Sequence, residues 1–117
     1  QPQHPGVAHY LIHSYDYPPI APRGLDAAHR YAKIAPAASH AQHMPSHIYI
    51  RVGAWKESIS ANAASAQADT TAGWNMMHAY DYMVYAHLQL GQDRAAQKVR
   101  ESAFGTGKMT DHFAAAY

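Results

Sequence analysis

Cysteine is absent from the chain, so disulfide bonds, zinc–thiolate sites and thiol catalysis are excluded. Charged residues make up 15% of the 117 residues, and the formal net charge is +1. No run of lysine and arginine gives the clustered basic surface of a nucleic-acid-binding protein. No apolar run approaches the roughly 20 residues of a membrane-spanning helix. We therefore expect no nucleic-acid partner and no membrane span, while either the cytoplasm or the periplasm remains open.

Phenylalanine and tryptophan are also scarce, with two of each, whereas the chain holds ten histidines and nine tyrosines. Hydrophobic residues make up 48% of the sequence, which is enough to build a core. Histidine is normally a minor residue, so its placement needs an explanation. The chain starts at Gln1 without a methionine and ends on the apolar run 113–117. We therefore expect a piece of a longer protein.

The first half of the chain repeats against itself with a period of 34 residues, as 43 − 9 shows for one pair. The pairs in this register are Pro2 and Pro36, His9 and His43, His13 and His47, and Tyr15 and Tyr49. A 34-residue period is typical of the tetratricopeptide repeat, in which each unit is a helix–turn–helix hairpin. The segments before and after Gly53 and Gly91 are similar, which predicts a third hairpin.

The pattern predicts an all-α fold with helices over 6–16, 22–34, 40–52, 55–68, 74–90 and 93–104, and no strands. These helices form three hairpins, at about 5–36, 39–70 and 75–105, in one domain over 1–117. We expect the hairpins to stack as a right-handed superhelix, and the tail 106–117 to begin a further helix.

Pro45 conflicts with a helix that starts at His40, because proline inside a helix removes a backbone hydrogen bond. Ser39 followed by Gln42 resembles a capping box and favours the early start. A start near Gln42 would instead put Pro45 in the first turn, where it costs little. The sequence leaves both starts open.

The chain resembles a group of bacterial tetratricopeptide-repeat proteins. Two segments carry this resemblance, His-Pro-Gly-Val-Ala-His-Tyr-Leu-Ile-His-Ser-Tyr-Asp over 4–16 and His-Met-Pro-Ser-His-Ile-Tyr over 43–49. It implies a fold but no reaction, so no catalytic residue is carried over. It also implies that the first helices of the hairpins line a concave groove. The groove residues are then His9, His13, Asp16, His40, His43, His47, Arg51, His78, Asp81 and Tyr85.

The histidines suggest a metal site on this face. His9 and His13 are four residues apart and share a helix face, as do His43 and His47 on the next such helix. Packed helices lie roughly 8–10 Å apart, so imidazoles from both can meet. The predicted metal ligands are His9, His13, His43 and His47, with zinc, copper, nickel or iron as the ion. Asp16, Asp81 and His78 could add ligands or fix histidine tautomers.

Three functions remain open at this point. The leading one is an interaction scaffold whose histidine-lined groove binds a protein or peptide partner or a ligand, with or without a transition metal. The second is a metal-dependent enzyme that uses the histidine and aspartate cluster. The third is self-assembly, either through stacking of repeats between copies or with the rest of a longer chain. A purely structural histidine–tyrosine–aspartate network is the alternative to any binding site.

Overall fold

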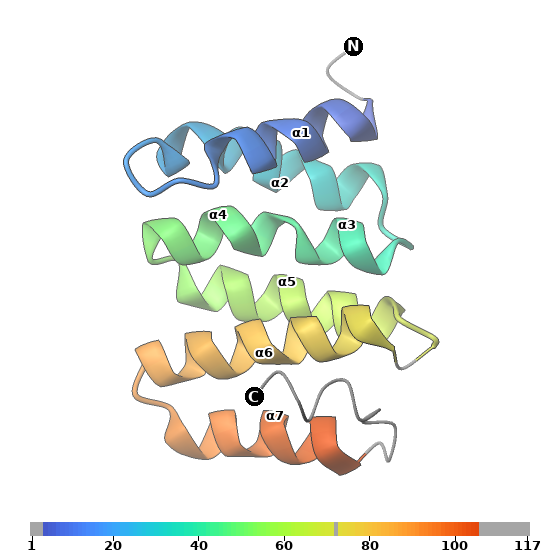
Figure 1. Cartoon of the computed structure of the whole chain (residues 1–117), viewed down its shortest axis with the longest axis vertical. Helices are drawn as coiled ribbons and strands as arrows, with labels where there is room; N and C mark the ends of the chain where they lie inside the picture. Colours follow the sequence, from blue (N-terminus) through green and yellow to red (C-terminus); the bar gives the residue numbers. More distant parts are fainter. Residues whose placement is uncertain (1–3, 72, 106–117) are drawn as a thin grey trace.

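The computed structural model describes residues 4–71 and 73–105, which form helices and no strand (Figure 1). The all-α prediction is therefore confirmed for this part of the chain. The elements are α1 (Pro5–Tyr15), the short 3-10 helix η1 (Ala21–Gly24), α2 (Leu25–Ile34), α3 (Ser39–His43), α4 (Pro45–Val52), α5 (Trp55–Ala68), α6 (Trp74–Gln89) and α7 (Asp93–Gly105). Pro2 of the 34-residue register and the predicted tail helix over 106–117 lie outside the described residues.

The predicted helix over 40–52 is divided by Pro45, which begins α4 at a position where its missing N–H costs nothing. Met44 between α3 and α4 keeps helical backbone angles, φ −51° and ψ −38°, so the chain continues in nearly the same direction. The expected capping box does not form: the Ser39 hydroxyl contacts Ser65, and the Gln42 amide donates to the Ala32 carbonyl. The early start is correct, but side-chain capping is not its cause.

Consecutive helices pack against one another along the chain, α1 against α2, α3 and α4 against α5, and α6 against both α5 and α7 (Figure 1). Contacts also join α1 to α4 and α3 to α6, so these helices lie side by side in one layer. All the histidines predicted for the groove belong to this layer. The layer therefore brings together side chains that are far apart in sequence.

Small side chains allow the close approach of the helices. Ala8 and Ala28 are fully buried beside Ile12 and Ile48. A Cβ on Gly24 would lie 2.7 Å from Ile48 Cδ1, so glycine is needed where η1 meets α4.

The two turn glycines adopt the backbone that the sequence predicts for them. Gly53 and Gly91 have φ values of 74° and 66°, the left-handed conformation expected after a helix end. Within the described residues, no helix combines the length and the apolar character needed to cross a membrane.

Candidate metal centre

Six histidines gather where α1, α3, α4 and α6 meet: His9, His13, His40, His43, His47 and His78. The first five form a closed circuit of ring contacts, with neighbouring centroids between 4.7 and 6.3 Å apart. The His78 ring lies 4.5 Å from the His43 ring. The tertiary structure thus brings side chains from four helices to one histidine cluster.

The protonation of His43 is fixed by a chain of hydrogen bonds that begins at a backbone carbonyl. The Ser58 carbonyl can only accept, and Asn62 Nδ2 donates to it at 2.8 Å. The amide is thereby oriented with Oδ1 toward His43 Nδ1, at 2.7 Å. Because Oδ1 can only accept, Nδ1 carries the proton. In neutral His43, Nε2 therefore carries a lone pair and no proton.

A carboxylate fixes the protonation of His47 in the same way. Asp16 Oδ2 lies 3.0 Å from His47 Nδ1, and Asp16 Oδ1 accepts from Arg51 Nε at 2.7 Å. The hydrogen bonds from Arg51 and His47 lower the pKa of Asp16 against an opposing effect of burial, which is the largest single cause. An ionised carboxylate only accepts, so Nδ1 of His47 carries the proton. Neutral His47 then also has a bare Nε2.

The two bare nitrogens face each other, with His43 Nε2 and His47 Nε2 3.1 Å apart. Two electron pairs at this distance repel each other unless a cation or an added proton lies between them. Two nitrogens bound to one zinc ion at about 2.0–2.1 Å, with tetrahedral angles, would be about 3.3 Å apart. The observed separation therefore suits two ligands of a single ion.

His78 completes a group of three. One ligand atom from each of His43, His47 and His78 lies within 4.8 Å of the other two, so the cluster could hold a metal ion. The His78 ring stacks on Trp74 at 5.7 Å, with an angle of 16° between the planes. Tyr82 packs its ring against all three imidazoles, with centroids 4.8–5.3 Å away. These aromatic contacts limit how the histidine rings can turn.

Burial keeps the three imidazoles neutral, which metal binding requires. Desolvation lowers the pKa of His43 to about 3, although the hydrogen bond to Asn62 opposes the shift. Desolvation also lowers the pKa of His47, against the opposing effect of Asp16. The pKa of His78 is lowered by burial as well. No proton must therefore be displaced from these rings before a metal binds at neutral pH.

The His9–His13 pair differs, because it can satisfy its hydrogen bonds without a cation. His9 Nε2 lies 2.9 Å from His13 Nε2, and His9 Nδ1 lies 3.1 Å from the Tyr31 hydroxyl. Burial raises the pKa of Tyr31, so the hydroxyl keeps its proton and can donate to Nδ1. His9 Nε2 then carries a proton and donates to His13. The pair therefore has a complete neutral hydrogen-bonding arrangement.

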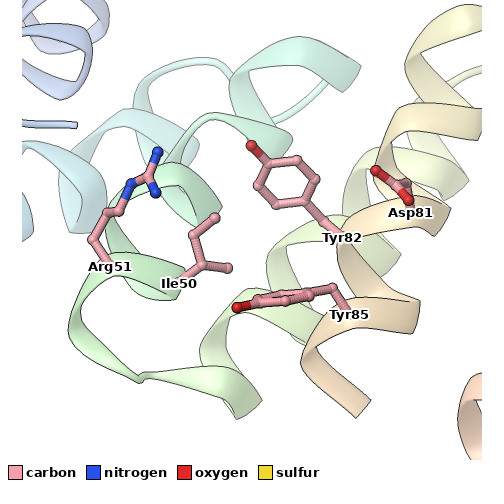
Figure 2. Close-up of a pocket in the computed structure, with 5 residues that line it drawn as sticks. All are labelled: Ile50, Arg51, Asp81, Tyr82 and Tyr85. Atoms are coloured by element: carbon pink, nitrogen blue, oxygen red, sulfur yellow. The ribbon is translucent and has the colours of Figure 1, made fainter. Parts of the chain in front are cut away.

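The residues predicted for the groove lie partly in the histidine cluster and partly in a neighbouring cavity. His43 and His47 of the predicted metal set lie with His78, while His9 and His13 pair beside them and exposed His40 contacts His9 and His43. Asp16 holds His47, as a tautomer-fixing acceptor would. The three other groove residues, Arg51, Asp81 and Tyr85, line a cavity of about 290 Å³ with Ile50 and Tyr82 (Figure 2).

Asn62 and Tyr82 belong to the site but were not predicted from the sequence. Tyr82 follows His78 by four residues, so helical spacing already puts it on the same face. Asn62 lies in the alanine-rich α5, where a single amide has no distinguishing pattern. It is nevertheless fully buried, so the structure, unlike the sequence, distinguishes it from the other residues of α5.

Comparison with known proteins adds nothing to this geometry, since the chain matches no family model, no curated protein and no solved structure.

Proposed function

We propose that this protein binds one divalent transition-metal ion through His43, His47 and His78. The observation that carries the proposal is the pair of facing Nε2 atoms, each left bare because an acceptor holds the opposite nitrogen of its ring. Histidines that ligate metals usually donate their other N–H in this way. Imidazole nitrogens suit zinc, copper, nickel and iron.

Three protein ligands leave a coordination position for a molecule from outside. In zinc proteins, structural sites are usually closed by four protein ligands, whereas sites with three keep one position for water or a bound molecule. We assign this position to a donor group of a protein or peptide partner or of a small ligand. The metal then acts as the contact point of an interaction scaffold.

The scaffold in this proposal is a stack of tetratricopeptide-like hairpins. Two observations support it: the 34-residue register places His9 and His13 in α1 where His43 and His47 occur in the second hairpin, and left-handed Gly53 and Gly91 follow the first helices of two hairpins. Equivalent positions of successive units would then supply one binding face.

Metal analysis tests the proposal. Chelator-stripped protein is incubated with zinc, copper or nickel, freed of excess metal and analysed for bound metal per chain. We expect about one ion per chain for the wild type, and at least tenfold weaker binding for His47→Ala and His78→Ala, because each loses a ligand.

His29→Ala is the matched control, because His29 is an exposed histidine outside the cluster. It should bind metal like the wild type. Circular dichroism establishes that each variant is folded. Equal metal content in the wild type and in folded His78→Ala would contradict the proposal, as would negligible binding of all three metals.

A further inference from the structure

One face of α1 is uncovered, although the same positions of the next helices in the 34-residue register are buried. Val7, Tyr10 and Ser14 have the three- and four-residue spacing of one helix face, and we call them the α1 face. Val7 is 44% exposed, Tyr10 is 74% exposed, and Ser14 is exposed as well. The residues 34 positions later are at most 2% exposed: Ala41, Met44 and Ile48.

A preceding helix covers these buried positions of α3 and α4. The helix is α2, which packs against both, and three of its side chains share one core cluster with them: Ala27, Ala28 and Tyr31. Within the described residues, no helix precedes α1, which lies at one end of the structure (Figure 1). The α1 face is therefore of the kind that packs against another helix.

The two end helices differ in charge. Helix α1 has no Asp, Glu, Lys or Arg among its 11 residues. Helix α7, at the opposite end of the described structure (Figure 1), has five charged side chains, all exposed: Asp93, Arg94, Lys98, Arg100 and Glu101. A polar outer face is what the end of a helical stack needs in water, whereas interface cores are poor in charge and rich in tyrosine. The composition of α7 is thus that of a solvated end, and the composition of α1 is that of an interface.

We infer that two copies of this chain associate through the α1 face of each, in a dimer with twofold symmetry. Packing α1 against α7 of another copy would bury charged side chains, which costs free energy, whereas two uncharged α1 faces can meet without this cost. A twofold contact uses the same surface on both copies and closes at two. The inference goes beyond metal binding, because the three proposed ligands lie on other helices and the contact needs no ion.

Analytical ultracentrifugation of the full chain over a wide range of concentrations tests the dimer, with chelator present and again after zinc loading. We expect an equilibrium between monomer and dimer in both states, without larger species. Tyr10→Lys should weaken dimerisation by about tenfold or more, because it removes a large aromatic side chain and places like charges on both sides of the contact. Phe104→Lys, at a 51% exposed position of α7, should leave dimerisation unchanged. Circular dichroism establishes that both variants are folded.

Cysteine cross-linking identifies the faces that meet, because the chain has no cysteine of its own. Ser14 and Ser102 are a matched pair, since each is exposed and donates its hydroxyl to the carbonyl four residues earlier. With a short bismaleimide, Ser14→Cys should link to a second copy of itself, and Ser102→Cys should not.

Three results would overturn the inference. The first is a monomer at every concentration, and the second is wild-type dimerisation of folded Tyr10→Lys. The third is Ser14→Cys that links to Ser102→Cys in a mixture but not to itself, which would indicate head-to-tail stacking. Because the dimer is also measured under chelation, its failure is distinct from any failure of the metal proposal.

Discussion

At the scale of single residues, the candidate site depends on which nitrogen of each imidazole carries its proton. The backbone carbonyl of Ser58 orients the Asn62 amide, and the amide oxygen then accepts a hydrogen bond from Nδ1 of His43, which keeps the proton on that nitrogen. Asp16 does the same for His47. Two residues outside the proposed ligand set, Asn62 and Asp16, thus leave the lone pairs of His43 Nε2 and His47 Nε2 facing each other.

Asn62→Ala removes the acceptor of His43 Nδ1 and lets this histidine change its tautomer. We expect zinc affinity to fall about 10–100-fold, the usual effect of losing such an orienting partner. The free energy of unfolding should fall by about 1–3 kcal/mol, because a buried N–H loses its hydrogen bond. Competition with a chromophoric chelator measures the affinity, and urea denaturation measures the stability.

Asn75→Ala is the control for this substitution, since Asn75 is exposed on α6. It should change neither quantity appreciably. Wild-type zinc affinity in a folded Asn62→Ala protein would show that the amide does not fix the tautomer of His43.

At the scale of helices and turns, the break at Pro45 does not disturb the histidine pair that spans it. His43 ends α3 and His47 lies in the first turn of α4, yet their ring centroids are 4.9 Å apart. The helical backbone angles of Met44 preserve the four-residue spacing across the proline. The pairing of these two histidines therefore survives even though one predicted helix becomes two.

Gly53 ends α4 in a left-handed conformation, which places the following helix α5 against the histidine layer. We expect Gly53→Ala to lower the free energy of unfolding by about 1 kcal/mol, because a Cβ is unfavourable at this backbone angle. The cost should come from the backbone alone, since the nearest atom to a new Cβ would be Trp55 Nε1 at 4.0 Å. Gly53→Asn should cost less, because asparagine tolerates this conformation.

Gly105→Ala provides the comparison for the turn. Gly105 is the last residue of α7, and a Cβ there would meet no atom within 4 Å. Urea denaturation should show no loss of stability for this variant. Equal losses at both positions would mean that the left-handed angle of Gly53 does not matter.

At the scale of the whole molecule, folding reduces the hydration of several imidazoles at once. Burial lowers the pKa of five histidines in the layer formed by α1, α3, α4 and α6: His9, His40, His43, His47 and His78. Each ring is protonated more readily in the unfolded chain than in the folded one. The unfolded state therefore binds more protons below the ordinary histidine pKa of 6.5.

Metal-free protein should consequently lose stability as the pH falls below about 6.5. The stabilising contribution of a group with a lowered pKa is present above its unfolded value and disappears toward its folded value, which is about 3 for His43. Between pH 6.5 and 5, His43 alone should cost about 2 kcal/mol, at about 1.36 kcal/mol per pH unit. Urea denaturation at a series of pH values in the presence of chelator measures this slope.

Replacing the buried histidine tests the origin of the slope. His43→Gln should show a smaller loss between pH 6.5 and 5 than the wild type, whatever its stability at neutral pH. His29→Gln, at an exposed position, should follow the wild-type slope. A slope that is unchanged in His43→Gln would assign the acid sensitivity to other groups.

Local patterns in the sequence predicted the helices, the turn glycines and the histidine pairs, because these depend on spacings of a few residues. The predicted helix over 55–68 coincides with α5, and those over 74–90 and 93–104 differ from α6 and α7 by one residue. The predicted helix over 22–34 is divided into η1 and α2, since its first turn is a 3-10 turn. Asn62 could not be predicted as a partner of His43, because only packing buries it there.

The sequence by itself determined that the chain is helical and that His43 and His47 share one helix face. Both follow from hydrophobic spacing, turn residues and the helical repeat. Only the tertiary structure brought His78 to these two histidines. His78 lies 31 residues after His47, as 78 − 47 shows. The tertiary structure also decided which ring nitrogens are bare, because a tautomer depends on partners such as Asp16 and Asn62, which come from other helices or from the turn after a helix. The spacing of residues along the chain does not predict those contacts.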